Sequence, residues 1–533
     1  MRLATIDIIV VAVYFVVIFG LAQVVSRDKA GHQKNSTDYF LASRNLPWWA
    51  IGASLIAANI SAEQIVGMSG SGYAIGLAIS SYEWMAALTI LIVGKYFLPI
   101  FLENRIYTMP QFLEQRYGPT TRTILAIFWL GLYVFVNLTS IIWLGSIAVT
   151  QVAGINQNVA LLALGLFALF YQLRGGLKAV ALTDIVQVTL LVLGGLMVSW
   201  ITLSTIGHGS VLSGFSMLTS QVPDHFRMIL PPSNPHFDDL PGISVLVGGM
   251  WIANLSYWGF NQYIIQRALA AKSIPEAQKG VVFAAFLKLV TPLVIVVPGI
   301  AAVLLAPALP KPDDAYPTMM RLLPTGILGL VFAALIAAIV ASTASKINSI
   351  STIFTLDLYA KFKGQKSNVE DLEGSETTTP SERHLVLVGR IAACVALVLA
   401  LLTARPLLGH SDQAFQYIQE YTGFFTPGIT VIFLLGLFWK RASEAGAITA
   451  AVGSFMLSLA MKLWAPGFPF MNRMLVVFFV TLALAVLVSL VVPGAAGRNR
   501  IDNSSVSYRT STSFNVAAVA VVMILVALYA TWW

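Results

Sequence analysis

The sequence predicts an all-α membrane protein that crosses the bilayer many times. Of its 533 residues, 57% are hydrophobic and only 11% are charged, and the mean hydropathy is +0.79. Soluble domains carry about 25% charged residues. Apolar runs of about 20 residues, the length that crosses a bilayer core as a helix, recur from end to end. A short polar motif also returns in a second apolar segment, which indicates an internal repeat.

Fourteen apolar segments are predicted to form transmembrane helices, two of them broken. They cover residues 5–25, 47–72, 75–102, 123–151, 158–173, 179–205, 243–266, 280–306, 326–358, 385–404, 413–438, 444–464, 474–493 and 513–532. The first segment has its basic residues after the apolar run, so it is predicted to be a retained helix and not a signal peptide. Because no long polar block could fold separately, residues 1–533 are predicted to form a single transmembrane domain.

The placement of Lys and Arg residues predicts the orientation in the membrane. The net charge is +8, and the basic residues are concentrated in alternate loops, beginning with Arg27 and Lys29 after the first segment. Cytoplasmic loops carry an excess of Lys and Arg, so these loops are predicted to lie inside and both termini outside. The basic charge is therefore a signal of topology, and no nucleic-acid partner is expected. The bilayer is the expected surrounding, and the oligomeric state is left open.

A repeated motif predicts how the segments are organised. "AANIS" at residues 57–61 returns as "IANLS" at residues 252–256, in the second and seventh predicted segments. The repeat unit therefore contains five helices, and an odd number inverts the second copy in the membrane. Residues 47–205 and 243–438 are predicted to be the two repeats, flanked by an extra helix at 5–25 and by further helices over 444–532. Inverted repeats build transporters, whose interrupted helices hold substrate near the midplane.

Polar side chains inside the apolar segments predict a ligand site. They include Asn59, Glu63, Gln64, Glu83, Asp184, Asn254, Lys288, Lys346 and Gln419. A charge near the bilayer centre costs about 2.5–3.5 kcal/mol on insertion scales, so such groups face a cavity or a partner. One interpretation is simple pairing between helices, with Glu83 or Asp184 bound to a lysine. The other is a site for a neutral polyhydroxylated ligand, because charged groups and amides bind hydroxyls while nearby aromatic faces cover C–H surfaces.

The same residues argue against an enzyme. The six histidines are scattered over loops in no metal-ligand pattern, and the single cysteine, Cys394, lies within an apolar segment. No nucleophile–base pair or phosphate-binding loop is present, so neither catalysis nor a cofactor is expected. A sensor that binds solute without moving it is the alternative from another class. It is less favoured because the sequence carries no signalling domain.

Several longer stretches give the chain a resemblance to a known family. They are "LPWWAIGASLIAANISAEQIVGMSGSGYAIGLAISSYEWM", "GGLKAVALTDIVQ", "ANLSYWGFNQYIIQRALAAKS", "VFAAFLKL", "NSISTIFTLDLY" and "AFQYIQEYTGFFTPGI". On these stretches the chain resembles the sodium/solute symporter family over essentially its full length. The resemblance implies a LeuT-type fold of two inverted five-helix repeats. It also implies uptake of a galactose- or glucose-like monosaccharide, coupled to sodium, by alternating access across a bacterial inner membrane.

The resemblance also implies roles for individual residues. The implied sugar-binding residues are Asn59, Gln64, Glu83, Asn254, Tyr257, Lys288 and Gln419. The implied gate residues are Met68, Tyr82 and Phe415 on the outer side, with Trp258 beside Tyr257 at the inner gate. The implied sodium site consists of the backbone carbonyls of Ala57, Ile60 and Ala338 and the hydroxyl of Ser342. Unwinding near residues 59–61 is expected to free the first two carbonyls.

Some positions depart from the family pattern. Ala86 stands where a sugar-site serine is usual, and Ser256 where one of two adjacent gate tyrosines is usual. Ala341 replaces the first of two adjacent serines of the sodium site and leaves one side-chain oxygen fewer. Lys346, four residues after Ser342 and on the same helical face, stands where the family has an uncharged residue.

Lys346 leaves two hypotheses about the coupling ion. Its ammonium group could replace or weaken sodium, with Asp184 as its partner, which would make uptake sodium-independent, proton-linked or facilitative. Alternatively Lys346 extends to the cytoplasmic interface and sodium still binds. Sodium is the predicted coupling ion. A symporter for another polyol, such as myo-inositol, is the alternative for the solute.

Overall fold

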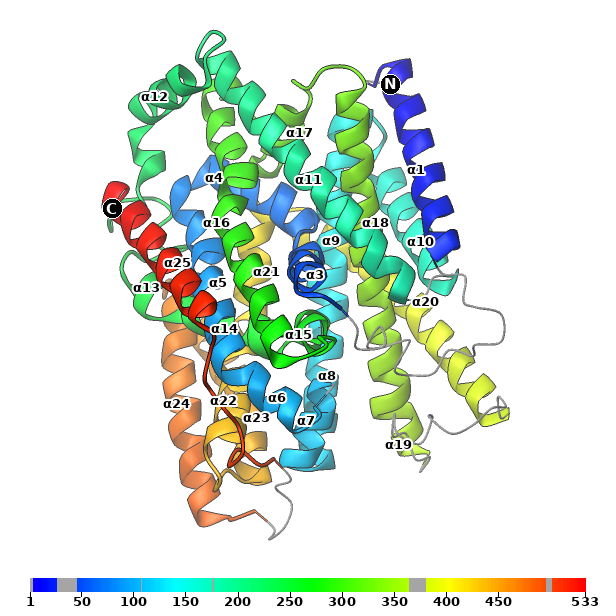
Figure 1. Ribbon diagram of the computed structural model, residues 1–533, viewed down its shortest axis with the longest axis vertical. Coiled ribbons are helices and arrows are strands. Elements are labelled where there is room, and N and C mark those ends of the chain that lie inside the picture. Colours follow the sequence, from blue (N-terminus) through cyan, green and yellow to red (C-terminus); the bar gives the residue numbers. More distant parts are fainter. Residues whose placement is uncertain (1–2, 26–45, 107, 175–176, 364–379, 495–500) are drawn as a thin grey trace.

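The computed structural model describes residues 3–25, 46–106, 108–174, 177–363, 380–494 and 501–533, and its regular secondary structure there is helical (Figure 1). One or more helical segments occupy each of the fourteen predicted ranges. By length and apolar composition, nine helices of the described residues can cross a membrane, or up to eleven when each of two bent pairs counts as one span. The exact count of fourteen spans and the five-helix repeat remain predictions.

The helical segments of the first part of the chain are α1 (Thr5–Val25), α3 (Trp48–Asn59), η2 (Glu63–Met68), α4 (Ser69–Ala74), η3 (Leu77–Ser80), α5 (Ser81–Ile92), η4 (Val93–Phe97), α6 (Leu98–Glu103), α7 (Met109–Arg116), α8 (Pro119–Leu132), η5 (Tyr133–Leu138), α9 (Thr139–Ala153), α10 (Gln157–Arg174) and α11 (Leu177–Ile206). Next come α12 (Val211–Gln221), η6 (Pro223–Phe226), α13 (Ser244–Val247), α14 (Gly249–Leu255), η7 (Ser256–Phe260), α15 (Gln262–Leu269), α16 (Ile274–Leu305), η8 (Pro312–Asp314) and α17 (Ala315–Met320). The last are α18 (Ile327–Thr352), η9 (Ile353–Tyr359), α19 (Ala360–Phe362), α20 (Pro380–Leu408), α21 (Ala414–Thr422), α22 (Thr426–Phe438), α23 (Glu444–Trp464), α24 (Phe470–Val491) and α25 (Thr512–Thr531).

The long helix α16 packs against α3, α4, α5 and α11, as Figure 1 shows for the middle of the bundle. Small residues allow these helices to approach closely, as is usual inside membranes. A Cβ on Gly52 of α3 would lie 2.7 Å from the Gly280 carbonyl oxygen of α16. At the edge, α1 packs on α18, where the Asp7 carboxylate accepts hydrogen bonds from the N–H groups of Gly326 (2.6 Å) and Gly329 (2.9 Å).

The first predicted interruption lies where the sequence placed it. Helix α3 ends at Asn59, Ile60 is extended (φ −71°, ψ 108°), and helical structure resumes at Glu63. The axes on the two sides of this break differ by 66°. Irregular backbone at membrane depth is tolerated where it lines a cavity or binds an ion. The break therefore marks the region in which a site is expected.

The second interruption lies further along the chain than the repeated motif predicted. Residues 252–256 are helical. Residues 256–260 form the wider π-helical turn of η7, so the helix is not interrupted until after Phe260. The extended residue is Asn261 (φ −81°, ψ 116°), whose side chain caps α15 by accepting a hydrogen bond from the Tyr263 N–H at 3.2 Å. A third bend of 46°, not predicted, separates α21 from α22.

Arg116 joins α7 to the end of α22 and the loop that follows it. The side chain is only 3% exposed. Its guanidinium group donates hydrogen bonds to the carbonyl oxygens of Gly436 (2.9 Å), Trp439 (2.9 Å) and Ala442 (3.0 Å). These carbonyls lie at or beyond a helix end, where no intrahelical partner is available. The Trp439 carbonyl also accepts a hydrogen bond from the Ala442 N–H at 3.1 Å, whereas Arg116 is the donor for the carbonyls of Gly436 and Ala442 among the described residues.

The substitution Arg116→Ala is expected to lower the thermal unfolding temperature of the protein in detergent. It removes the donors for the carbonyls of Gly436 and Ala442, and each buried group left unsatisfied costs about 1–3 kcal/mol. Lys440→Ala is the matched control, because this side chain is exposed in the same loop and should not change the unfolding temperature. Equal unfolding temperatures for the two variants would contradict this role of Arg116.

Candidate functional site

A cavity lies beside the first interruption, between η2, α5, α14, η7 and α21. It holds about 830 Å³ of space not filled by atoms, counting the part open to solvent. Six of the seven predicted sugar-binding residues line it: Asn59, Gln64, Glu83, Asn254, Tyr257 and Gln419. The predicted gate residues Met68, Tyr82, Trp258 and Phe415 line it too.

The seventh predicted residue, Lys288, lies behind the cavity wall and does not line it. Its side chain is 0% exposed, and its ammonium group donates hydrogen bonds to Glu83 Oε2 (2.5 Å) and to Asn59 Oδ1. Asn59 Nδ2 in turn donates to the Tyr257 hydroxyl at 3.1 Å. The Lys288 ammonium also lies 5.0 Å from the centroid of the Trp258 ring. Lys288 therefore orients Glu83 and Asn59 from behind, and the chain of contacts ends at Tyr257.

The remaining amides keep hydrogen-bonding capacity for a ligand. Gln64 Oε1 accepts a hydrogen bond from the Ser61 hydroxyl at 3.4 Å, and Asn254 Nδ2 donates to the Met250 carbonyl of its own helix at 3.1 Å. In the part of the chain that the structure describes, the Gln419 side chain makes no hydrogen bond. An amide offers two donor hydrogens and an acceptor oxygen. These three residues can therefore bind the hydroxyl groups of a polyhydroxylated solute.

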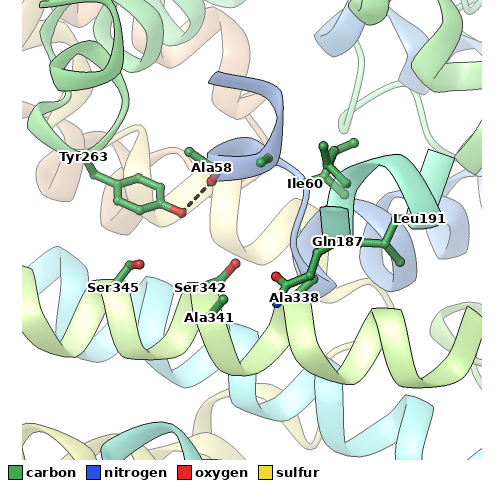
Figure 2. Close-up of a pocket in the computed structure, with 11 residues that line it drawn as sticks. Ala58, Ile60, Gln187, Leu191, Tyr263, Ala338, Ala341, Ser342 and Ser345 are labelled. Carbon is green, nitrogen blue, oxygen red and sulfur yellow. Dashed lines mark hydrogen bonds between the residues drawn. The ribbon is translucent and has the colours of Figure 1, made fainter. Parts of the chain in front are cut away.

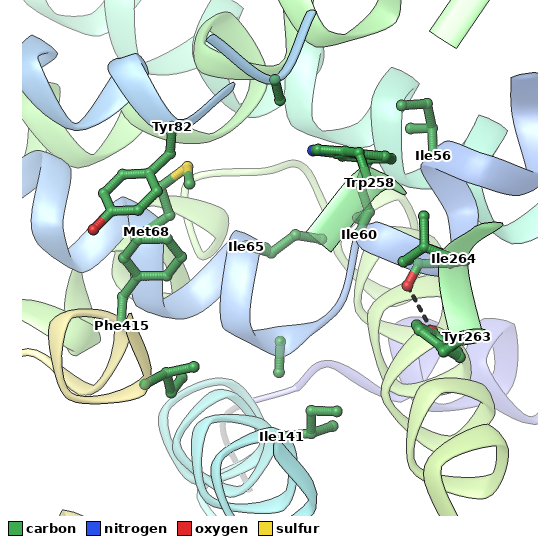
Figure 3. Packing of buried hydrophobic residues seen from close by; sticks show 14 of the residues in the cluster. Ile56, Ile60, Ile65, Met68, Tyr82, Ile141, Trp258, Tyr263, Ile264 and Phe415 are labelled. Atoms are coloured by element: carbon green, nitrogen blue, oxygen red, sulfur yellow. Dashed lines mark hydrogen bonds between the residues drawn. The ribbon is translucent and has the colours of Figure 1, made fainter. Parts of the chain in front are cut away.

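Three apolar side chains close the cavity on the side predicted to be outer. The rings of Tyr82 and Phe415 meet edge to face, with centroids 5.1 Å apart, and Figure 3 shows Met68 beside them. Met68 and Phe415 are both fully buried. Segments η2 and α21 approach closely here, since a Cβ on Gly67 would lie 3.3 Å from the Phe415 Cβ. The predicted outer gate residues are therefore in contact.

Part of the cavity wall was not predicted. Trp129 and Leu132 of α8 line it, and so do Phe470, Met471 and Met474 at the start of α24. Helix α24 lies outside both predicted repeats, and its local sequence pattern is that of an ordinary membrane helix. Only packing between segments distant in the sequence brings these side chains to the cavity.

A second, smaller pocket, with about 290 Å³ of space not filled by atoms when the part open to solvent is counted, collects the residues of the predicted sodium site. Ala57, Ile60, Ala338, Ala341 and Ser342 all line it. Figure 2 shows the Ser342 side chain on α18 directed toward the segment that carries the first break. Unwound backbone carbonyls coordinate Na⁺ at interrupted helices, and the Ser342 hydroxyl offers one further oxygen here. The residues present therefore fit a small monovalent cation.

Two polar residues of this pocket, Gln187 and Ser345, were not predicted. Ser345 lies three residues after Ser342, so helical spacing alone places it on the same face. Gln187 lies on α11, three residues after Asp184. Asp184 itself falls within α11, but its side chain lies outside the described residues.

Lys346 does not line the sodium-site pocket, and it does not extend to the surface. Its side chain is 4% exposed, and its ammonium lies 4.2 Å from the ring centroid of Tyr263 and 4.7 Å from that of Tyr133. It also interacts electrostatically with Glu63. Glu63 Oε1 accepts a hydrogen bond from the Ser140 hydroxyl at 2.6 Å. Lys346 is therefore held between two aromatic faces and opposite a carboxylate.

Tyr263 separates Lys346 from the pocket. Its ring lines the pocket and also faces the lysine ammonium, a favourable cation–π arrangement. Its hydroxyl donates a hydrogen bond to the Ala58 carbonyl at 2.5 Å, next to the first break. Tyr263 therefore connects the charged pair of Lys346 and Glu63 to the backbone of the cation pocket.

Comparisons with known proteins agree on one family. The model of the sodium:solute symporter family matches residues 39–453. The sodium/glucose cotransporter of Vibrio parahaemolyticus is 50% identical, and the match covers 100% of this chain and 99% of the relative. Sodium/myo-inositol cotransporter 2 of Bos taurus is 32% identical over 85% of this chain and 69% of its own length.

Two solved structures share the fold. A Na⁺-coupled sialic acid symporter in a substrate-bound outward-open state superposes with a TM-score of 0.75 at 22% identity, over 92% of this chain and 99% of the other. A nucleobase-cation-symport-1 family transporter in a closed conformation gives a TM-score of 0.55 at 11% identity, over 87% of this chain and 98% of the other. At these identities the likeness concerns the fold alone.

Proposed function

This chain belongs to the sodium:solute symporter family, and on that premise we propose that it carries a glucose- or galactose-type monosaccharide into the cell together with sodium. It is a membrane transporter and not an enzyme. The observation that carries the proposal is the convergence of six predicted sugar-binding residues in one cavity, next to a separate pocket of carbonyl and hydroxyl groups. The bacterial relative at 50% identity, a sodium/glucose cotransporter, supports both the solute class and the ion.

In the proposed sugar site, a carboxylate held in place by a lysine and three amide side chains form hydrogen bonds with the sugar. Lys288 holds Glu83 in one orientation, so that the carboxylate can accept hydrogen bonds from sugar hydroxyls. Gln64, Asn254 and Gln419 supply further donors and acceptors. Each interaction is stronger inside a closed cavity than in water, because the local dielectric is lower. Tyr257 is positioned by Asn59 to cover one face of the sugar.

The proposed coupling runs through the first break. Sodium bound by the carbonyls of Ala57 and Ile60 and by Ser342 would join α3 to α18. Asn59 lies between those two carbonyls and donates to Tyr257, the proposed inner gate. Loss of the ion would allow the backbone at the first break to move. That movement would disrupt the hydrogen bond from Asn59 that positions Tyr257. In this scheme sodium release and inward release of sugar are linked through a single short segment.

The position of Lys346 supports sodium as the coupling ion. A lysine that replaced sodium would place its ammonium in the cation pocket, whereas the Lys346 ammonium stacks behind Tyr263. Glu63 balances its charge, so the lysine need not repel a cation nearby.

Ala86→Ser is expected to lower the KM for hexose uptake by a few-fold to about tenfold. Ala86 lines the cavity, and the new hydroxyl can contribute one hydrogen bond to the sugar, worth about 0.5–1.5 kcal/mol. Ala87→Ser is the matched control, because Ala87 is buried on the same helix away from the cavity. An equal KM for both variants would argue against the proposed sugar position.

Uptake of labelled galactose into proteoliposomes tests the function. We expect accumulation by the wild-type protein, loss of accumulation in Gln64→Ala, and competition by unlabelled glucose and galactose. Stronger competition by myo-inositol than by either hexose would replace the monosaccharide with a polyol. Sugar binding without uptake would favour a sensor and contradict transport.

A further inference from the structure

A buried carboxylic acid lies at the outer end of the gate, away from both proposed ligand sites. Asp313 belongs to η8, in the connection between α16 and α17, and its side chain is 1% exposed. Its Oδ2 accepts a hydrogen bond from the Ala414 N–H, the first residue of α21, at 3.1 Å. Its Oδ1 is buried and has no hydrogen-bond partner among the residues that the structure describes. An ionised carboxylate left in this state is strongly disfavoured.

The unpartnered side of Asp313 lies against α4. A Cβ on Gly70 would lie 2.5 Å from Asp313 Oδ1 and 2.8 Å from its Cα, so only glycine allows this approach. The carboxyl group is therefore wedged between the starts of α4 and α21. Met68 immediately precedes α4, and Phe415 is the second residue of α21. The helices that cover Asp313 are thus continuous with the segments that carry the outer gate residues Met68 and Phe415.

Asp313 forms no ion pair within the described residues. The nearby charged groups are Asp314 and Lys311 of its own segment and Asp412 before α21. Asp314 accepts a hydrogen bond from Gln151 Nε2 at 2.9 Å, and Lys311 donates to the Gly409 carbonyl at 2.7 Å.

The packed helices add no free cation. Helix α9 has no ionisable residue, and the ionisable residues of α4, η2, α17 and α21 are Tyr73, Glu63, Tyr316, Tyr417, Glu420 and Tyr421. Glu63 interacts with Lys346, while Glu420 is paired with Lys462 and Arg473. Burial therefore affects the ionisation of Asp313 more strongly than the neighbouring charges do.

We propose that Asp313 is a proton-binding site that couples closure of the outer gate to uptake of a proton from the outer solution. This proposal rests on the transport function proposed above. When the gate is closed, the carboxyl group is buried and neutral. When α21 moves away from α4, water reaches the carboxyl group, which releases the proton and becomes a solvated carboxylate. The proton is thus a ligand of the closed conformation, distinct from sugar and sodium.

The direction of the pH effect follows from the pKa of Asp313 in each state. Burial raises this pKa to about 8 in the closed structure. A solvated aspartate has a pKa of about 3.9. The closed conformation therefore binds a proton that the open one lacks between about pH 4 and pH 8, and it loses this stabilisation as pH rises through 8. The closing equilibrium should fall about tenfold between pH 7 and pH 9.

External labelling of a cavity cysteine tests the proposal without requiring transport. Cys394, the single cysteine, is replaced by serine, and Ala86→Cys places a reporter in the cavity wall. An impermeant thiol reagent outside the vesicle reaches this cysteine only through an open outer gate. Labelling rates at pH 7 and pH 9 are compared with and without D313N, so that the pH dependence of thiol chemistry cancels in the ratio.

We expect the reporter protein with Asp313 to gain about tenfold more labelling between pH 7 and pH 9 than the same protein carrying D313N. D412N, which removes an exposed charge nearby, should keep the pH dependence. Gly70→Ala forces α4 away from Asp313 and should raise labelling already at pH 7. Equal pH dependence with and without D313N, or unchanged labelling in Gly70→Ala, would overturn the proposal. Absence of sugar uptake in every variant would contradict the proposed function but leave this result standing.

Discussion

Lys288→Ala is expected to abolish sugar uptake and to destabilise the protein. The substitution leaves Glu83, which is 3% exposed, without the ammonium that neutralises it. It also removes the hydrogen bond that Lys288 donates to Asn59 Oδ1. Removing one member of a buried ion pair costs about 3–5 kcal/mol. Uptake of labelled sugar and thermal unfolding in detergent measure the two effects separately.

A double substitution distinguishes stability from function at this pair. Glu83→Gln combined with Lys288→Met removes both charges, so no unpaired charge remains buried, and most of the thermal stability should return. Uptake should stay absent, because the oriented carboxylate is lost. Uptake by Lys288→Ala at the wild-type rate would contradict the role given to Lys288. Uptake restored in the double variant would remove Glu83 from the proposed sugar site.

Glu63→Gln is expected to weaken sodium binding by about tenfold or more. The Lys346 ammonium would lose the carboxylate that balances it while remaining behind Tyr263, next to the cation pocket. At an effective dielectric constant of about 20, a unit charge on the order of 10 Å away contributes about 1–2 kcal/mol. A difference of about 1.4 kcal/mol is tenfold in affinity. The sodium concentration for half-maximal uptake measures this effect.

Charge rescue tests whether the effect of Glu63→Gln is electrostatic. Adding Lys346→Met removes the uncompensated charge, so the double variant should recover a sodium affinity close to that of the wild type. Lys346→Met alone leaves Glu63 anionic near the pocket and should bind sodium at least as tightly as the wild type. A double variant no better than Glu63→Gln would show that Glu63 acts through local structure and not through charge.

The helices and the first break follow from local chemistry, and the second break does not. Long apolar segments separated by polar turns predict helices, and helical structure lies in each predicted range. The break at Ile60 was expected because polar residues cluster there. The motif at residues 252–256 suggested a matching break, yet the backbone stays helical as far as Phe260, where Gly259 packs on Phe97. A wide turn of this kind depends on packing against another helix, which a local motif does not contain.

The residues of the candidate site could be predicted only where they belong to recognisable sequence motifs. Gln64 and Glu83 stand in long recognisable stretches, whereas Phe470, Met471 and Met474 reach the cavity through the packing of α24. The unusual lysine at position 346 could be recognised from the sequence, but the direction of its side chain could not be predicted. Two tyrosines from α15 and η5 determine where its ammonium lies, and neither is near it in the chain. Side-chain direction in a membrane bundle depends on such tertiary partners.

Sodium-driven sugar uptake tests the central claim most directly. Proteoliposomes containing the purified protein are given labelled galactose with an inward sodium gradient, or with the sodium replaced by potassium, at matched pH and clamped voltage. We predict uphill accumulation of sugar only with the sodium gradient, and loss of that stimulation in Ser342→Ala, whose hydroxyl lines the cation pocket. Equal uptake with and without sodium would contradict sodium coupling. It would favour a proton-linked or facilitative mechanism instead.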